Sequence, residues 1–210
     1  MKVSLIWKKL NLDGREFVGS EALHGMCRDA GKGYDDAVAY LLRKGYLVRV
    51  FRGTFYVRGP DELDLGRVRY DPLGLVARGL AFRGIGDWYF GLETALKLNG
   101  MTYEYFAREY VISATFRRTK PVAILDREFE FLRWKRAVVG FGVVAKGPMR
   151  YSDREKTLLD MAYLRLYHGM SHGAVVRVVS EYADAVSKGK LKEYAASYPR
   201  SVRDVAEGLA

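Results

Sequence analysis

The sequence predicts an α+β fold, in which helices and strands alternate along the chain and helices alone complete it. Near the N-terminus, apolar residues recur at positions 3, 6, 7 and 10, the spacing of one helix face. Two short alternating runs over 47–51 and 54–58 predict a β-hairpin. Beyond residue 152 the apolar pattern is helical to the end, so we expect a small central sheet followed by C-terminal helices.

The first sixty residues predict three helices and a hairpin. The helices are expected over 2–12, 20–28 and 34–44, and Gly45 ends the third as a C-terminal glycine. Gly53 can take the positive φ that the tight turn between the two strands demands. This order is typical of a winged helix-turn-helix domain, here residues 1–60, whose third helix enters the major groove of DNA.

A polar, turn-rich stretch over 61–72 predicts a linker. The remainder, 73–210, predicts an α+β domain that ends in a helical tail. Ser152 and Glu155 have the S-x-x-E spacing of a capping box and predict the start of the first C-terminal helix. The other elements are expected as helices over 73–82, 92–98, 173–186 and 191–210, broken at Pro199, and as strands over 87–90, 109–116, 123–134 and 138–144.

Composition limits the classes of protein that this chain can be. With 49% apolar residues among 210, the chain can build a substantial core. Cys27 is its only cysteine, which excludes an internal disulfide and a multi-cysteine zinc site. No apolar run approaches the ~18 residues that span a membrane, and no signal-peptide pattern opens the chain, so we expect a cytoplasmic protein without membrane contact. Glutamine is absent and asparagine is scarce, a bias associated with thermophile proteins.

The net charge of +10 points to an acidic partner. Residues 1–60 carry 11 basic and 6 acidic groups, the largest excess per residue in the chain. That distribution is the footprint expected of a small domain that binds a polyanion.

The hairpin tip and the third helix supply the predicted DNA contacts. Arg52 at the tip can meet phosphates, and basic or aromatic residues on either side extend the surface. These flanking residues are Lys32, Tyr34, Tyr40, Arg43, Arg49 and Arg58. Asp35 and Asp36 oppose this interpretation because they would repel phosphate. The alternative is a protein-interaction module that docks a partner through the same helices and hairpin.

In its order of elements and in several short sequence stretches, the chain resembles the AbiEi family. Members of this family are antitoxins and transcriptional regulators of type IV toxin–antitoxin systems linked to phage defence. The resemblance covers about residues 1–170 and lies in RGTFYV, DWYFGLETALKLNGMT, YVIS with FRRTK, and YSDREKTLLDMAYL. It implies an N-terminal domain that represses its own operon by binding inverted repeats in promoter DNA. It also implies an antitoxin domain that counters a nucleotidyltransferase-type toxin without necessarily forming a stable complex.

The resemblance implies seven DNA-contacting positions: Lys32, Tyr34, Tyr40, Arg43, Arg49, Arg52 and Thr54. The acidic pair Asp35-Asp36 and the extended C-terminal tail depart from the family pattern. An orphan regulator without antitoxin activity therefore stays open as a second alternative.

A second basic surface is expected on the central sheet. Its members lie in two neighbouring sequence clusters: Arg117, Arg118, Lys120, Arg133, Lys135 and Arg136. A solvated face is the competing interpretation, and contact with DNA or RNA is the functional one.

Other patterns give weaker chemical signals, and no enzyme activity, metal or cofactor is predicted. His168 and His172 have i, i+4 spacing, but flanking glycines oppose a helix there. The spacing of two predicts that Asp126, Glu128 and Glu130 lie on one face of a strand, where a solvated edge is the common arrangement. They would form a nuclease-like carboxylate cluster with Glu155-Lys156 only if the fold brought them together. Residues 84–87 precede a strand rather than a helix, which excludes a phosphate-binding loop, and Cys27 is expected to be packed.

Overall fold

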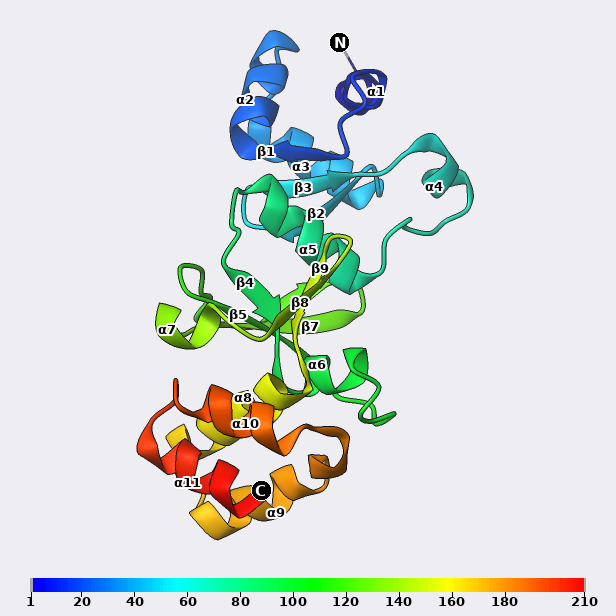
Figure 1. The fold of residues 1–210 in the computed structure, drawn as a ribbon. Coiled ribbons are helices and arrows are strands. Elements are labelled where there is room, and N and C mark those ends of the chain that lie inside the picture. The colour runs from blue at the N-terminus through cyan, green and yellow to red at the C-terminus, as the bar shows by residue number, and fades with distance from the viewer. Residues whose placement is uncertain (1, 210) are drawn as a thin grey trace. The chain divides into compact units, whose positions relative to one another are not determined.

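The structure is a computed structural model that describes residues 2–209, without the side chain of Ala185. It divides into two compact units, one up to Gly84 together with Ile124–Asp126, and one comprising Ile85–Ala123 and the chain from Arg127 onwards. Figure 1 shows the helices and strands of each unit. The predicted α+β class is confirmed, with a central sheet and C-terminal helices.

The first unit places a three-stranded antiparallel sheet, in the order β1-β3-β2, among five helices. Its elements are α1 (Ser4–Leu12), β1 (Phe17–Gly19), α2 (Ser20–Asp29), α3 (Tyr34–Arg43), β2 (Leu47–Phe51), β3 (Thr54–Val57), α4 (Pro60–Asp64) and α5 (Pro72–Phe82). Helices α1 to α3 bury one apolar stripe each against one face of β3, in a core that includes Ile6, Leu23, Leu41 and Phe55.

Residues 61–72, predicted as a linker, are tied to the first unit by a buried carboxylate. Glu62 of α4 accepts hydrogen bonds from the Tyr56 hydroxyl at 2.9 Å, from Gly59 N–H at 2.7 Å and from Arg69 N–H at 2.5 Å. Burial and this carboxylate raise the pKa of Tyr56. The compact unit consequently continues through α5 to Gly84, beyond the predicted boundary at 60.

The second unit contains a six-stranded mixed sheet in the order β6-β7-β5-β4-β9-β8. Strands β5 and β7 run parallel over six paired residues, from Arg108 opposite Glu128 to Ser113 opposite Arg133. Its strands are β4 (Trp88–Phe90), β5 (Arg108–Ser113), β6 (Val122–Ile124), β7 (Arg127–Arg133), β8 (Val143–Lys146) and β9 (Met149–Ser152). Its helices are α6 (Leu92–Leu98), α7 (Arg136–Val139), α8 (Arg154–Tyr167), α9 (His172–Ser180), the 3-10 turn η1 (Ala183–Ala185), α10 (Lys188–Ala195) and α11 (Arg200–Leu209).

Helix α8 lies at the centre of the second unit and packs against α6, α9, α10 and α11 (Figure 1). Its first turn differs from the predicted capping box. Asp153 is the N-cap and accepts a hydrogen bond from Lys156 N–H at 3.0 Å, whereas Ser152 lies in β9 and bonds Thr157 at 2.8 Å. Glu155 instead accepts from Ser187 N–H at 2.9 Å, ahead of α10.

The strand predicted over 138–144 is wrong. Arg136–Val139 form the short helix α7, and β8 begins only at Val143. Val138 and Val139 are buried in the core of the second unit, so the apolar run reflects burial rather than strand geometry.

Candidate nucleic-acid interface

The N-terminus of α3 brings together side chains from three elements of the first unit. The Tyr34 ring stacks on the His24 imidazole of α2, with centroids 3.6 Å apart and planes at 9°. Arg49 of β2 lies near enough to act on the Tyr34 hydroxyl. Burial raises the pKa of that hydroxyl, and the Arg49 charge opposes the rise. His24 is a member that the sequence did not reveal, because no local pattern links residues 24 and 34.

The cations predicted for this surface are exposed. Lys32 precedes α3, Arg43 ends it, and Arg52 occupies the hairpin tip. The guanidinium of Arg49 lies 5.6 Å from the centroid of the Phe55 ring. Within residues 2–209, none of Lys32, Arg43, Arg49 and Arg52 forms an ion pair with a carboxylate. Their charges are therefore available to an acidic partner.

The hairpin is not a free arm. Its tip is held by a hydrogen bond from Ser20 N–H to Gly53 O at 2.9 Å, and Gly53 has the predicted positive φ, +74°. On the face opposite α1 to α3, helix α5 approaches so closely that a Cβ at Gly79 would lie 2.9 Å from Val50 Cγ1. Thr54 is only 3% exposed, so the hairpin presents Arg52 rather than Thr54 to an external partner.

Two further predicted residues have mainly packing roles. Tyr40 is half-buried, and its ring lies 6.4 Å from that of Tyr46, which itself stacks on Trp7. Arg58 was expected along the wing, but its guanidinium donates to the carbonyl oxygens of Gly45, Glu62 and Arg67. Those carbonyls occupy the Arg58 side chain and remove it from the surface available for phosphate.

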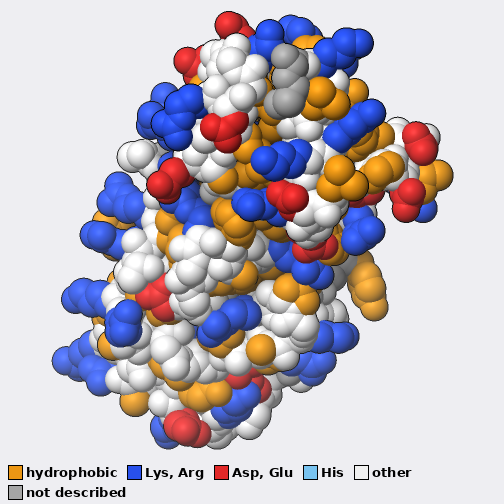
Figure 2. Space-filling view, turned by 90° about the horizontal axis from the view of Figure 1, so that it is seen from above, with side chains coloured by type: hydrophobic (Ala, Val, Ile, Leu, Met, Phe, Trp, Pro, Cys, Tyr) orange, Lys and Arg blue, Asp and Glu red, His pale blue; other side chains and the backbone are white. Residues whose placement is uncertain are grey.

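Acidic side chains interrupt the basic surface. Asp35 and Asp36 in the first turn of α3 are both exposed. Figure 2 shows Lys and Arg side chains spread over the visible face with fewer Asp and Glu side chains between them. Carboxylates therefore lie among the exposed cations around α3 and the hairpin.

The second basic surface is divided by the structure. Four of its predicted members line one groove of about 400 Å³ in the second unit: Arg117, Arg118, Arg133 and Lys135. The groove is also lined by Trp134, which lies between Arg133 and Lys135, and by Tyr163, Tyr167 and His168 at the C-terminal end of α8. Lys120 is exposed and does not line the groove.

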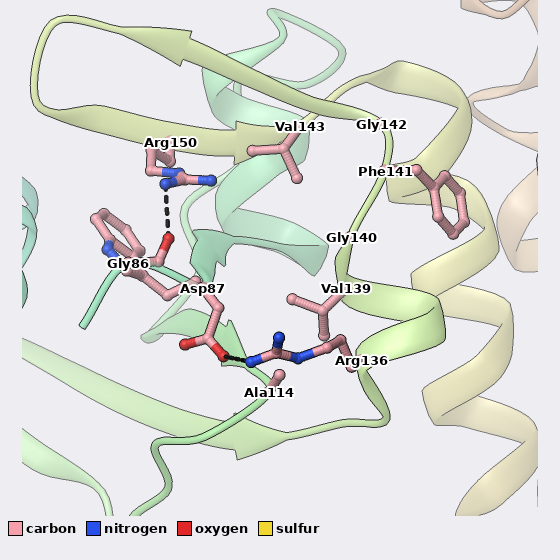
Figure 3. Close-up of a pocket in the computed structure, with 11 residues that line it drawn as sticks. Gly86, Asp87, Ala114, Arg136, Val139, Gly140, Phe141, Gly142, Val143 and Arg150 are labelled. Carbon is pink, nitrogen blue, oxygen red and sulfur yellow. Dashed lines mark hydrogen bonds and ion pairs between the residues drawn. The ribbon is translucent and has the colours of Figure 1, made fainter.

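Arg136, the sixth predicted member, lines a different cavity of about 540 Å³. Figure 3 shows it reaching Asp87, with Nη2 3.5 Å from Oδ2, while Arg150 donates to Gly86 O at 2.6 Å. Both guanidinium groups therefore already have oxygen partners in this cavity.

The weaker chemical patterns do not assemble into sites. Glu128 and Glu130 both pair with Arg108, at 2.8 and 3.4 Å, and Asp126 lies in the turn before β7. His168 caps the end of α8 and His172 begins α9, so the two histidines do not share a helix. Cys27 is buried, which raises the pKa of its thiol. Across residues 2–209, no three His, Cys, Asp or Glu side chains are placed to hold a metal ion.

The sequence did not reveal a buried ionic cluster in the second unit. Lys156 and Asp160 are both fully buried, with Nζ 3.2 Å from Oδ1. Asp160 also accepts hydrogen bonds from the hydroxyls of Tyr198 at 2.5 Å and Tyr89 at 2.9 Å. Burial lowers the pKa of Lys156 and raises that of Asp160, while each charge opposes the shift of the other. The i, i+4 spacing of Lys156 and Asp160 was a visible signal, but their tyrosine partners lie 71 and 38 residues from Asp160.

Lys156 Nζ is enclosed on all sides. It donates to Val138 O at 2.5 Å and lies 4.5 to 5.4 Å from the centroids of the Phe141, Tyr89 and Tyr198 rings. A fully buried cation whose amine is satisfied by protein partners in this way acts as a structural centre.

No protein-family model matches the chain, and no curated protein matches it. Among solved structures, the chain is similar to the RV2827C protein from Mycobacterium tuberculosis. The TM-score is 0.61 at 18% sequence identity, and the match covers 98% of this chain and 75% of that chain. At this identity the likeness shows the fold alone. No helix within residues 2–209 combines the length and apolar character needed to cross a membrane.

Proposed function

We propose that this protein is a DNA-binding transcriptional regulator whose first unit is a winged helix-turn-helix and whose second unit is an antitoxin-like domain. The order α1, β1, α2, α3 and the β2–β3 hairpin supports the first half of this proposal, because winged domains present a helix and a hairpin to duplex DNA. A regulator of this kind acts in the cytoplasm, at its own promoter.

One observation carries the DNA-binding half. Lys32, Arg43, Arg49 and Arg52 surround α3 and the hairpin, are exposed, and form no ion pair within the described residues. Phosphate contacts by such cations release counterions and supply much of the affinity for duplex DNA. Tyr34, stacked on His24 at the N-terminus of α3, adds a hydroxyl that can donate to phosphate.

The enclosed hairpin constrains how the duplex is bound. Because α5 and the α1–α3 core cover its two faces, the hairpin cannot bend towards DNA as a flexible arm. The contact is instead made by the exposed cations around α3, from Lys32 before the helix to Arg43 at its end, together with the rigid tip at Arg52. Asp35 and Asp36 limit affinity, so the operator must supply base contacts or a shape that offsets their repulsion.

The direct test is a gel-shift titration with the DNA upstream of the gene. The double variant Arg43→Ala/Arg52→Ala should lose affinity by at least about tenfold, because two charge-assisted contacts are removed. Arg177→Ala is the matched control, since Arg177 is an exposed arginine on α9 without an ion pair among the described residues. Unchanged affinity in the double variant would reject this interface.

The antitoxin half is supported by the sequence resemblance to the AbiEi family. It implies a toxin of the nucleotidyltransferase type, encoded by a neighbouring gene, that this protein counters. The antitoxin activity is tested by the growth of cells that express the neighbouring gene, first alone and then together with this protein. Restored growth is expected; persistent arrest with both proteins present would leave an orphan regulator.

A protein-docking role is the second candidate, and the exposed Asp35-Asp36 pair favours it. Two carboxylates on the outer face of α3 suit a basic protein partner better than phosphate. Under this alternative, Arg43→Ala/Arg52→Ala would leave operator affinity unchanged, and a stoichiometric protein complex would depend on Asp35 and Asp36.

A further inference from the structure

We propose that the groove of the second unit lined by Arg117, Arg118, Arg133, Lys135, Tyr167 and His168 binds single-stranded nucleic acid. This site is separate from the proposed duplex-binding surface, because all of its residues belong to the second unit. An experiment can therefore reject single-strand binding in the groove without rejecting duplex binding by the first unit, and the reverse also holds.

The basic wall of the groove is built from the segment after β5 and from the end of β7. Arg117 and Lys135 are exposed, and Arg133 is the exposed last residue of β7. Within residues 2–209, none of these three forms an ion pair, and no Asp or Glu lines the groove. Cations held close together without acidic neighbours repel one another, and an anionic chain relieves that repulsion.

The rigidity of this wall comes from packed aromatic rings. The Arg118 guanidinium lies 5.2 Å from the centroid of the Phe116 ring, and that ring meets Phe131 edge-on at 5.4 Å. The backbone N–H of Trp134 donates a hydrogen bond to Ser113 O at 3.0 Å, which fixes the chain between Arg133 and Lys135. The cations therefore project from a braced surface rather than from a mobile loop.

The opposite wall is the C-terminal end of α8. Tyr167 is 79% exposed there, while Tyr163, one turn earlier, packs edge-on against Trp134 at 5.0 Å. His168 follows Tyr167, with ring centroids 5.8 Å apart. An exposed tyrosine and imidazole beside a basic wall provide a platform on which unpaired bases stack.

The arrangement favours a single strand over a duplex. Bases in a duplex stack on one another and cannot reach the Tyr167 ring, whereas unpaired bases can turn onto it. The C-terminal end of α8 carries a partial negative charge, which repels phosphate. The strand therefore lies with its phosphates along the arginine wall and its bases towards α8. A volume of about 400 Å³ has room for a base with its flanking phosphates.

The test measures fluorescence anisotropy of labelled oligouridine RNA, oligothymidine DNA and a mixed-sequence duplex, each about 12 nucleotides long, with the full-length protein. Tyr167→Ala should weaken binding of the single strands by about 5- to 150-fold, as expected for loss of one stacked base, and should leave duplex binding unchanged. Tyr167→Phe keeps the ring and should bind within about twofold of the wild type. Tyr167 is exposed, so these variants should fold; circular dichroism checks this.

Charge variants separate a built groove from general attraction by a basic protein. Arg117→Ala/Arg133→Ala should weaken single-strand binding far more per charge than the Arg177→Ala control. Stronger binding of the RNA would identify RNA as the ligand through its 2′-hydroxyl, and equal binding of both strands would identify contacts to phosphate and base alone. Equal losses in all arginine variants, or an unaltered affinity in Tyr167→Ala, would overturn the proposal.

Discussion

The two units of this chain differ in the charged residues that they bury. In the first unit Lys32, Arg43 and Arg52 stand exposed without ion pairs among the described residues. In the second unit Lys156 and Asp160 are fully buried at 3.2 Å. Exposed charges contribute little to stability, whereas removal of one partner from a buried pair leaves an uncompensated charge in the core. The cations of the first unit are therefore free to serve binding, and the pair in the second serves the fold.

Each unit also contains a buried carboxylate, and the partners of these carboxylates differ. Among the described residues, the Glu62 carboxylate in the first unit accepts hydrogen bonds from neutral groups, the Tyr56 hydroxyl and two backbone N–H groups. Asp160 in the second accepts from a cation and two tyrosines. The first arrangement fastens a surface segment to a sheet; the second joins α8 to β4 and to the segment between α10 and α11.

The largest expected effect comes from removing Asp160. Asp160→Ala leaves the Lys156 ammonium buried and two tyrosine hydroxyls without their acceptor, so we expect the free energy of unfolding to fall by about 3–5 kcal/mol. Urea titration followed by tryptophan fluorescence measures it. Asp204→Ala, an exposed aspartate on α11, is the control and should shift stability by less than about 0.5 kcal/mol. If Asp160→Ala and Asp204→Ala lowered the free energy of unfolding by similar amounts, the buried pair would not have this stabilising role.

A glycine-to-alanine substitution should lower the free energy of unfolding at one site in the second unit and raise it at one site in the first. In the second unit a Cβ at Gly91 would overlap Cδ1 of the fully buried Ile112, so Gly91→Ala should cost about 1–3 kcal/mol. In the first unit Gly25 lies in the interior of α2, and a Cβ added there would meet nothing within 4 Å. Gly25→Ala should therefore stabilise the protein by about 0.5–1 kcal/mol. Thermal unfolding of both variants decides the signs, and a destabilised Gly25→Ala would contradict the packing described for α2.

A smaller effect concerns the pH dependence of stability. Burial acts to raise the pKa of Glu155, but the Ser187 N–H and the Lys190 ammonium outweigh it and hold that pKa below its ordinary value of 4.5. A carboxyl whose pKa is lowered by folding adds stability above 4.5, and that contribution is lost as the pH falls through the lowered value. The difference in unfolding free energy between wild type and Glu155→Gln should therefore be greatest near neutral pH and shrink in acid. If the difference in unfolding free energy instead grew as the pH fell, folding would raise the pKa of Glu155 rather than lower it.

The sequence predicted elements whose pattern is local and missed those set by distant contacts. Helices α1 to α3 and the β2–β3 hairpin follow from spacing and from Gly53, and they lie within a few residues of the predicted bounds. Strand β1 has only three residues, too few to show alternation. The run 138–144 looks like a strand because burial and strand formation select the same apolar residues.

The candidate sites were predictable to a similar extent. Exposure of Arg43 and Arg52 follows from their positions on a helix face and in a turn. The burial of Thr54 and the capture of Arg58 depend on α4 and α5, which pack onto the hairpin from later in the chain. The aromatic side chains opposite Arg117 and Arg133 come from the end of α8, at least thirty residues further along the chain, so no local pattern predicted them.

The salt dependence of operator binding shows whether Arg43 and Arg52 contact DNA phosphates. For wild type and Arg43→Ala/Arg52→Ala, the logarithm of the association constant for duplex DNA is measured against the logarithm of salt concentration. If these two side chains contact phosphates, the slope should become shallower by about 2 in the double variant, while Arg177→Ala keeps the wild-type slope. Identical slopes for wild type and the double variant would show that the exposed cations around α3 and the hairpin do not meet DNA.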